Sequence, residues 1–315
     1  MLADQLAALV ADAVRIERLE LLTGGASRET WSFDAVLADG AVRPLILRRD
    51  PPAAPSAGLS VEAHAITAAR RAGVPEPEIL AFGDDSDAVD APYIVMERLA
   101  GETLARRILR DAAFADVRPR LAEQCGEILA RIHGIPTDDV PGLEHPDVLA
   151  DLQQTIRSFD DASPALELGL RWLEQHRPPP AAEVVVHGDF RNGNLIIGPD
   201  GIRAVLDWEL VHRGDPMQDL GYLCVRAWRF GGLGPVGGFG DYDDLFRGYE
   251  RVSGRAVERE VVRWWELYGT VWWGGGCMVQ ARRHLSGAER SVELAAIGRR
   301  VVEQEYDTLL LLERA

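Results

Sequence analysis

The chain has 315 residues, of which 47% are hydrophobic, and its 34 basic and 50 acidic side chains give a formal net charge of −16. This composition is typical of a folded globular protein and excludes intrinsic disorder, while the acidic balance argues against binding to nucleic acid or to an anionic membrane. Every basic side chain is an arginine, which excludes Walker A ATPases and Schiff-base enzymes because both need a lysine amine.

The N-terminal segment MLADQLAALVADAV has the pattern of an amphipathic helix and carries Asp4 and Asp12 where a secretion signal has basic residues. We therefore predict a helix and no signal peptide. No uncharged apolar run reaches the roughly 18 residues of a membrane span. The cysteines, Cys125, Cys224 and Cys277, are too widely spaced for a metal or redox pair. We expect a cytoplasmic protein with reduced thiols.

Residues 16–50 alternate between apolar and polar side chains, with a glycine-rich break and an Asp39-Gly40 turn. This pattern predicts a meander of three strands. After a proline-rich loop, Ser60 is expected to cap a helix that ends at Gly73. The segments EILAF and YIVMERL predict two more strands, so the first part of the chain is a predicted five-stranded antiparallel lobe with one helix.

From Gly101 onward the spacing of apolar residues becomes helical. A short β insertion follows, in which NLII, a Pro-Asp-Gly turn and IRAVLDW predict a hairpin. Helices resume after Asp215, a good capping residue. The segment 231–240 is predicted to be a flexible loop, and two long helices are predicted near 257–285 and 289–313.

The stretch VVHGDFRNGNLIIGPDGIRAVLDWEL holds the residues that point to chemistry. It places Asp189 five residues before Asn194, and Asp207 thirteen residues after Asn194 at the end of the predicted hairpin. Phosphoryl transfer from Mg·ATP needs a carboxylate that accepts the proton of the attacking hydroxyl, together with oxygen ligands that hold magnesium. The stretch supplies side chains for all of these roles.

The HGDxxxxN…D pattern resembles the catalytic loop and metal-binding aspartate of the aminoglycoside phosphotransferase and choline kinase-like family. LRR at 47–49 together with HGD-x-R resembles the branch of this family that is associated with acyl-CoA dehydrogenases. The resemblance covers most of residues 16–285 and implies an α+β, protein-kinase-like fold with two lobes. It implies a nucleotide-binding lobe at 1–98 and a larger, mainly helical, catalytic and substrate-binding lobe at 99–315.

The resemblance also implies roles for single residues. Asp189 corresponds to the catalytic base, and Asn194 and Asp207 correspond to the magnesium ligands. Arg191 is expected to meet the γ-phosphate and stabilise its developing charge, with a solvated loop arginine as the alternative. His187 is expected to support the loop through a hydrogen bond rather than to transfer a proton.

Nucleotide binding is expected in the first lobe. TGGASRET would cover the phosphates with the backbone N–H groups of Gly25, Ala26 and Ser27, although a Gly-Gly pair is also a common turn. The family has a lysine on the third strand, and Arg48 stands in its place, where a guanidinium can bind phosphate oxygens bidentately. Glu62 is its expected partner on the helix. The alternative for both charges is an exposed surface position.

Three more positions follow from the resemblance. YIVMERLAGETL matches the connection between the lobes, where the family holds adenine through backbone groups near Glu97 and Leu99; a buried strand end followed by a helix cap has the same pattern. Asp219 matches an aspartate that braces the catalytic loop.

The substrate is expected to be small. Gly188 stands where protein kinases have an arginine, and only eight residues separate Asp207 from Pro216, which leaves no room for an activation segment.

The acidic residues at 241–244 either attract a cationic substrate or begin a solvated helix. One predicted helix carries several aromatic side chains on one face: Trp264, Trp265, Tyr268, Trp272 and Trp273. These side chains either pack in the core or line the substrate cleft. In the cleft they could cage a quaternary ammonium or stack on a sugar or an acyl chain.

The sequence thus predicts an ATP- and Mg²⁺-dependent phosphotransferase, a small-molecule kinase whose acceptor is an alcohol group of the aminoglycoside, hydroxyacyl, amino-alcohol or sugar type. The alternative is a catalytically inactive nucleotide-binding pseudokinase that acts as an interaction module. The missing lysine favours this alternative, whereas the presence of the base and both metal ligands opposes it. The type of acceptor, the oligomeric state and the choice between ATP and GTP stay open.

Overall fold

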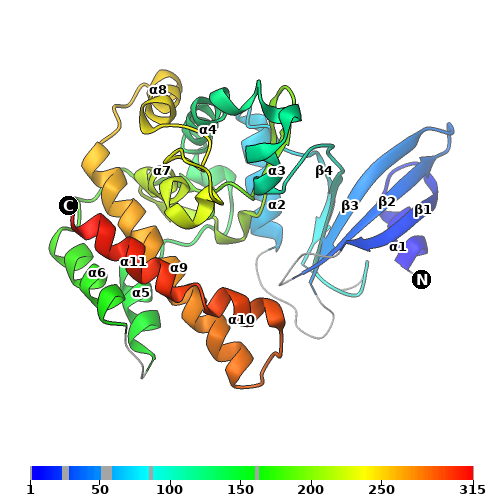
Figure 1. Cartoon of the computed structure of the whole chain (residues 1–315). Helices are drawn as coiled ribbons and strands as arrows, with labels where there is room; N and C mark the ends of the chain where they lie inside the picture. The colour runs from blue at the N-terminus through cyan, green and yellow to red at the C-terminus, as the bar shows by residue number, and fades with distance from the viewer. Residues whose placement is uncertain (1, 23–27, 51–58, 85–87, 160–162, 315) are drawn as a thin grey trace.

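The computed structural model describes residues 2–22, 28–50, 59–84, 88–159 and 163–314. A β-sheet lies at one end of the molecule and a larger group of helices at the other, with α2 between them (Figure 1). The elements that precede the helical part are α1 (Leu2–Leu9), β1 (Ala13–Leu22), β2 (Glu29–Leu37), β3 (Val42–Arg49), α2 (Leu59–Arg71), β4 (Ile79–Gly83) and β5 (Tyr93–Glu97).

The five strands form an antiparallel sheet in the order β1-β2-β3-β5-β4. Side chains alternate along β3: Leu45 and Leu47 are fully buried in the cluster that also contains Leu6 of α1. Since successive side chains of a strand point to opposite faces, Ile46 and Arg48 lie on the face toward α2. Ile46 packs in the cluster formed with α2. The alternation of β3 therefore brings Arg48 to the same side of the sheet as α2.

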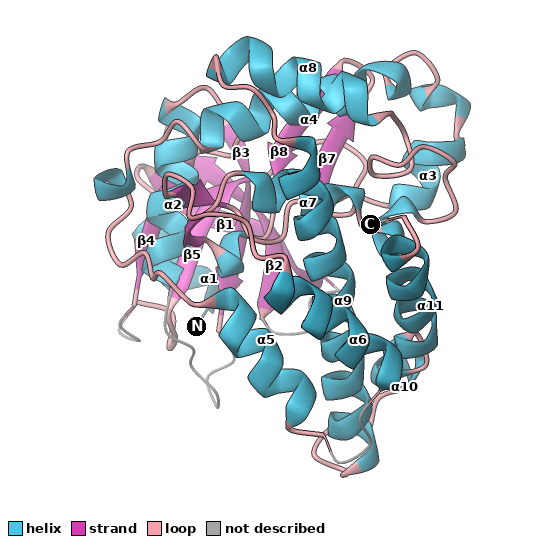
Figure 2. Cartoon of the chain, turned by 90° about the vertical axis from the view of Figure 1, so that its left-hand side faces the viewer, coloured by secondary structure: helices cyan, strands magenta, loops and turns pink. Residues whose placement is uncertain are grey.

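The helical part contains two short β pairs among its helices. Its helices α4 and α8 approach backbone to backbone: a Cβ added at Gly126 would lie 2.1 Å from the carbonyl oxygen of Leu245. Helices α6, α9 and α11 lie side by side (Figure 2). The elements are α3 (Ala105–Arg110), η1 (Ala112–Phe114), α4 (Arg118–Ile132), η2 (Thr137–Asp139), α5 (Val148–Arg157), α6 (Pro164–Gln175), β6 (Val184–Val186), β7 (Leu195–Gly198), β8 (Gly201–Val205), η3 (Trp208–Leu210), β9 (His212–Gly214), α7 (Met217–Cys224), η4 (Arg226–Arg229), α8 (Tyr242–Ser253), α9 (Arg259–Leu285), α10 (Val292–Gly298) and α11 (Val301–Leu312).

The predicted hairpin is present, because β7 pairs with β8 and Gly198 lies opposite Gly201. The structure adds a second pair, β6 with β9, that the sequence did not predict. The helical part contains no helix long and apolar enough to cross a membrane, and the same holds for the rest of the described chain.

Three predictions about helix bounds were wrong. The first helix ends at Leu9 rather than near residue 14, since Asp12 has a positive φ of 61° and the chain then enters β1. Helix α2 already includes Ser60, which is therefore no cap. The predicted last helix is two helices, because Arg299 and Arg300 separate α10 from α11. The segment 231–240 is a loop, as predicted, and its second half is packed: Val236 is fully buried and its backbone pairs with that of Gly240, whereas Leu233 is fully exposed.

Candidate active site

The segment 187–194, which we call the catalytic loop, connects β6 to β7. Its first turn needs a glycine, because Gly188 has a φ of +82° and an added Cβ would lie 2.5 Å from the carbonyl oxygen of Leu210. Asp219 of α7, which is fully buried, accepts hydrogen bonds from the backbone N–H groups of His187 at 2.8 Å and Gly188 at 2.9 Å. The start of the loop is thereby fixed to α7.

His133 was missed by the sequence reasoning. Its Nε2 lies 3.1 Å from Oδ2 of Asp219 and its Nδ1 lies 3.1 Å from the hydroxyl of Tyr249. Burial alone would raise the pKa of Asp219, but the contacts with His133 and the donors of the loop hold the pKa below its ordinary value. No local pattern could have revealed His133, because 86 residues separate it from Asp219.

His187 supports the catalytic loop from within. Its Nδ1 accepts the backbone N–H of Asp189 at 3.1 Å, and its Nε2 lies 3.1 Å from the carbonyl oxygen of Leu206. A ring that accepts through Nδ1 and donates through Nε2 is the neutral tautomer. Burial lowers the pKa of His187 below 6.5, against the raising effect of Asp219. His187 is thus placed as a structural group that bridges the loop and the end of β8.

A pH dependence of stability follows. The pKa of His187 is lower in the folded chain than in the unfolded chain. As pH falls below about 6.5, the unfolded chain therefore binds more protons than the folded chain does. The stabilisation from neutral His187 is complete above that pH and is lost as pH falls toward the folded pKa. We expect the difference in unfolding free energy between the native chain and His187→Gln, measured by urea denaturation, to shrink between pH 7.5 and pH 5.5. A difference that grows toward acid pH would contradict this assignment.

Asp189 lies at the centre of the loop. Its carboxylate accepts hydrogen bonds from Nε of Arg191 at 3.0 and 3.2 Å and from Nδ2 of Asn194 at 2.6 Å. Burial raises its pKa, and the positive charge of Arg191 opposes that rise. The guanidinium of Arg191 lies 4.7 Å from the ring centre of Trp228. Arg191 is therefore a held side chain rather than a solvated one.

Asn194 and Asp207 are brought together by the β7–β8 hairpin. The backbone carbonyl of Asn194 accepts the N–H of Leu206 at 2.7 Å, which places Asn194 beside the end of β8. Asp207 follows with a left-handed φ of 70° and begins η3. The side-chain nitrogen of Asn194 is used by Asp189, whereas no donor in the described part of the chain reaches its Oδ1. Oxygen atoms of both side chains can therefore serve as ligands.

The sheet contributes Arg48 to the same site. Nη1 of Arg48 lies 3.1 Å from Oε2 of Glu62 on α2, and Nη2 lies 3.4 Å from Oδ1 of Asp207. Glu62 is buried, with 2% of its side chain exposed. Arg48 thus connects the sheet, α2 and the hairpin of the helical part.

Arg28 is a second arginine at Glu62 that the sequence reasoning missed. Its Nη1 is paired with Glu62, and its Nε lies 3.1 Å from Oδ1 of Asp50. The absence of lysine was the available signal, since a Lys or Arg partner of Glu62 can only be an arginine in this chain. Gly25, Ala26 and Ser27, which were expected to bind phosphate, lie outside the described residues.

The connection between sheet and helices starts at the end of β5. The backbone N–H of Glu97 is already used, because it donates to the carbonyl of Glu78 at 2.9 Å. Leu99 follows in a segment without regular structure, and its backbone N–H has no acceptor among the residues that the structure describes.

The aromatic residues of α9 differ in their surroundings. Trp264 and Trp265 are buried in the main core, as the packing alternative predicts. Tyr268 is buried in the same core and, together with Trp272 and Trp273, also lines a cavity of about 530 Å³ that reaches the catalytic loop at Gly188; we call it the aromatic pocket. Tyr222 of α7 also lines this pocket, and its pKa is raised well above the ordinary value by burial and then by the nearby carboxylate of Asp189.

The acidic residues at 241–244 do not form a free anionic site. Asp243 is paired with Arg259 at 2.6 Å and Asp244 with Arg247 at 2.5 Å. Asp241 occupies the position before α8, and its side chain makes no capping hydrogen bond. The solvated helix start, rather than a site for a cation, describes them best.

Solved structures of other proteins have the same fold as this chain. A candidate aminoglycoside phosphotransferase of Ralstonia eutropha superposes with a TM-score of 0.78 at 21% identity, covering 99% of this chain and 98% of the other. An aminoglycoside phosphotransferase in complex with AMP-PNP and hygromycin B superposes with a TM-score of 0.65 at 17% identity, covering 99% and 98%. The fold is therefore that of the protein-kinase-like phosphotransferases, an α+β fold with two lobes, as the sequence predicted.

Comparison of the amino-acid sequence identifies the family to which the chain belongs. Residues 22–260 match the model of the phosphotransferase enzyme family, and the chain belongs to this family. Acyl-CoA dehydrogenase family member 10 of Mus musculus is 31% identical over 246 residues, which are 71% of this chain and 22% of that protein. The match thus spans less than a quarter of this curated relative, and it confirms the predicted resemblance to the branch associated with acyl-CoA dehydrogenases.

Proposed function

We propose that the chain transfers the γ-phosphate of Mg·ATP to a hydroxyl group of a small molecule. The observation that carries this proposal is the junction of three segments at one point: Arg48 of the sheet contacts Asp207, and Asn194 contacts both Asp189 and the strand that leads to Asp207. Such a junction brings two carboxylates, an amide oxygen and a guanidinium close together, which supports a site for phosphoryl transfer.

In this proposal residues 1–98 bind the nucleotide and residues 99–315 carry the catalytic loop and the acceptor. Arg48, held by Glu62, takes the place of the family's lysine at the phosphates, and Gly25, Ala26 and Ser27 cover them. Adenine is held by backbone groups near Glu97 and Leu99, and the N–H of Leu99 is available for it.

Asn194 and Asp207 are the proposed magnesium ligands. The described residues contain no group of three or more His, Cys, Asp or Glu side chains that could hold a metal ion without other ligands. This fits magnesium, which is usually bound through one or two carboxylates together with substrate phosphates and water. When bound, the ion would neutralise charge that develops on the transferred phosphate.

Asp189 is the proposed base, since burial raises its pKa and thereby increases its affinity for the hydroxyl proton. The acceptor is proposed to lie in the aromatic pocket, because this pocket reaches the catalytic loop at Gly188 and contains Tyr222 beside Asp189. Arg191, fixed between Asp189 and Trp228, is proposed to stabilise negative charge on the phosphate.

Nucleotide binding is tested by thermal unfolding with ATP, with and without Mg²⁺, for the native chain and for Asp207→Ala. Ligand at about 100 times its Kd stabilises the folded state by roughly 2.7 kcal/mol. We expect a Mg²⁺-dependent rise in Tm for the native chain and loss of that dependence in the variant. Asp200→Ala, at the exposed turn of the same hairpin, should behave like the native chain. No rise with ATP or GTP would exclude a nucleotide site at Arg48.

A further inference from the structure

A cavity of about 1120 Å³ borders the catalytic loop at Gly193, five residues along the chain from Gly188, where the aromatic pocket lies. Its walls are formed by α3 and the residues before it, by η4 and the turn that follows it, and by α11 with the preceding Arg300. Gly193 lies beside Arg191, since a Cβ added at Gly193 would lie 2.9 Å from Nη1 of that arginine, but the side chain of Arg191 does not line this cavity. We call it the arginine cavity after five residues that line it: Arg106, Arg107, Arg110, Arg226 and Arg300.

The charge of this lining is opposite to that of the protein. Two carboxylates, Glu303 and Asp307, face the five arginines, so the lining carries a formal charge of 5 − 2 = +3, whereas the whole chain carries −16. A concave surface lined by one sign of charge focuses the electric potential and concentrates ions of the other sign. The cavity is therefore an attractive place for an anion on an otherwise anionic protein.

Three of the five arginines already have a carboxylate partner. Arg226 pairs with Asp307 at 2.8 Å, Arg300 with Glu303 at 3.0 Å, and Arg107 with Glu102, outside the lining, at 3.2 Å. These three pairs connect side chains around the cavity, and they do not include the other two arginines, Arg106 and Arg110.

Arg106 and Arg110 have no carboxylate partner in the part of the chain that the structure describes. They are four residues apart on α3, so their like charges share one face of the helix, which is unfavourable without a counter-charge. The guanidinium of Arg110 extends across the cavity, with Nη2 3.8 Å from the Cβ position of Gly231. The described residues supply no anion for this pair, and an anionic ligand in the cavity would.

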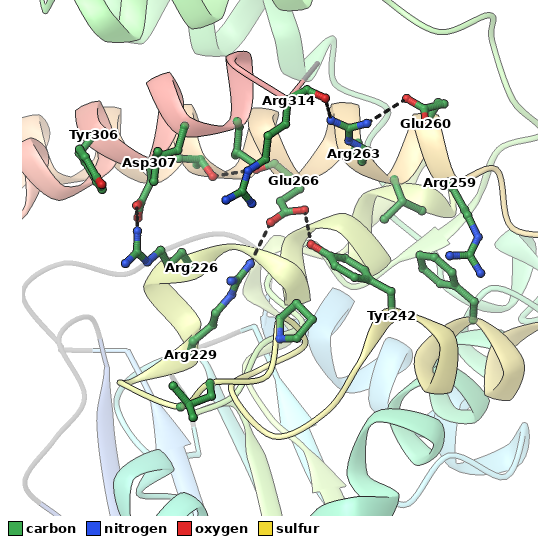
Figure 3. A pocket seen from close by; sticks show the side chains of 18 of the residues that line it. Arg226, Arg229, Tyr242, Arg259, Glu260, Arg263, Glu266, Tyr306, Asp307 and Arg314 are labelled. Atoms are coloured by element: carbon green, nitrogen blue, oxygen red, sulfur yellow. Dashed lines mark hydrogen bonds and ion pairs between the residues drawn. The ribbon is translucent and has the colours of Figure 1, made fainter.

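The positive region continues into a neighbouring cavity of about 920 Å³, which shares Arg226 and Asp307 with the arginine cavity. Figure 3 shows this second cavity, with the Arg226–Asp307 pair at one side and Arg314 extending inward near Glu266. Glu266 is already bonded to Arg229 at 3.0 Å and to the hydroxyl of Tyr242 at 2.8 Å. With five arginines and three carboxylates, the lining of this second cavity carries a formal charge of 5 − 3 = +2.

We propose that the arginine cavity binds a small molecule that carries two or more phosphate or carboxylate groups, with Arg106 and Arg110 as its main charged contacts. The guanidinium group suits this ligand because it donates paired hydrogen bonds to phosphate or carboxylate oxygens. None of the side chains proposed for phosphoryl transfer lines this cavity. Binding of a ligand in the cavity can therefore be measured independently of catalytic activity.

The test is calorimetric titration with inorganic tripolyphosphate at low salt, with and without excess AMP-PNP. We expect Arg106→Ala/Arg110→Ala to weaken binding about tenfold or more, as the loss of two charged contacts implies. The control Arg71→Ala/Arg120→Ala removes two exposed arginines that line none of these cavities and should leave Kd within about twofold.

Absence of tripolyphosphate binding to the native chain would overturn the proposal, and so would equal affinity in the two double variants. Displacement of the probe by AMP-PNP would also overturn it, since that result places the probe in the nucleotide site. Because the readout is binding, an inactive protein that still binds tripolyphosphate through Arg106 and Arg110 would refute the proposed phosphotransfer while leaving this site intact.

Discussion

Replacing Asp189 by alanine is expected to lower kcat for Mg²⁺-dependent ATP turnover by about 10²–10⁴, the usual contribution of a general base. The physical reason is its position: a buried carboxylate whose pKa is raised by burial, held by Arg191 and Asn194 at the centre of the catalytic loop. Turnover is measured as ADP release by the purified protein. Retention of the native rate would remove Asp189 from the reaction.

Two further variants separate catalysis from folding. Asp189→Asn keeps the shape of the side chain and should lose turnover to a similar degree while its thermal unfolding stays close to that of the native chain. Asp200→Ala removes an aspartate whose side chain is 69% exposed in the neighbouring hairpin turn, and it should keep native turnover.

Asp219→Ala is expected to lower the free energy of unfolding by about 3–5 kcal/mol, the usual cost of removing one partner from a buried charged cluster. The substitution leaves the backbone N–H groups of His187 and Gly188 without their acceptor and removes the partner of His133. Urea denaturation measures the change as a shift in midpoint.

Asp215→Ala is the matched control for that experiment. Asp215 lies four residues earlier in the chain and accepts one backbone hydrogen bond, from Met217 at 2.8 Å, at the start of α7. Loss of such a contact costs about 1 kcal/mol. If both substitutions cost the same, Asp219 does not brace the catalytic loop.

The sequence predicted those parts of the fold that depend on local pattern. The alternation of β3 and the turn between β7 and β8 are visible in a few residues each, and these two features place Arg48 and Asp207. The order of the predicted strands and helices, together with the HGDxxxxN…D spacing, was sufficient to predict the two-lobed fold, which the comparisons support.

Contacts between distant segments could not be predicted in this way. Arg28 pairs with Glu62 across 34 residues, and β6 pairs with β9 although the β7–β8 hairpin lies between them in the chain. The break between α10 and α11 was also missed, since apolar residues continue through it with helical spacing and the interruption depends on tertiary packing. The charge of the arginine cavity was hidden for the same reason, because its arginines come from three separate segments.

The measurement that tests the central claim most directly is ³¹P NMR of the protein with Mg·ATP and a set of hydroxylated small molecules, compared with Asp189→Asn. The proposed phosphotransferase should consume ATP and form a phosphomonoester in step with ADP, and the variant should form neither at a comparable rate. Nucleotide binding without phosphate transfer, with the native chain no faster than Asp189→Asn, would contradict the account and would identify the chain as an inactive nucleotide-binding module.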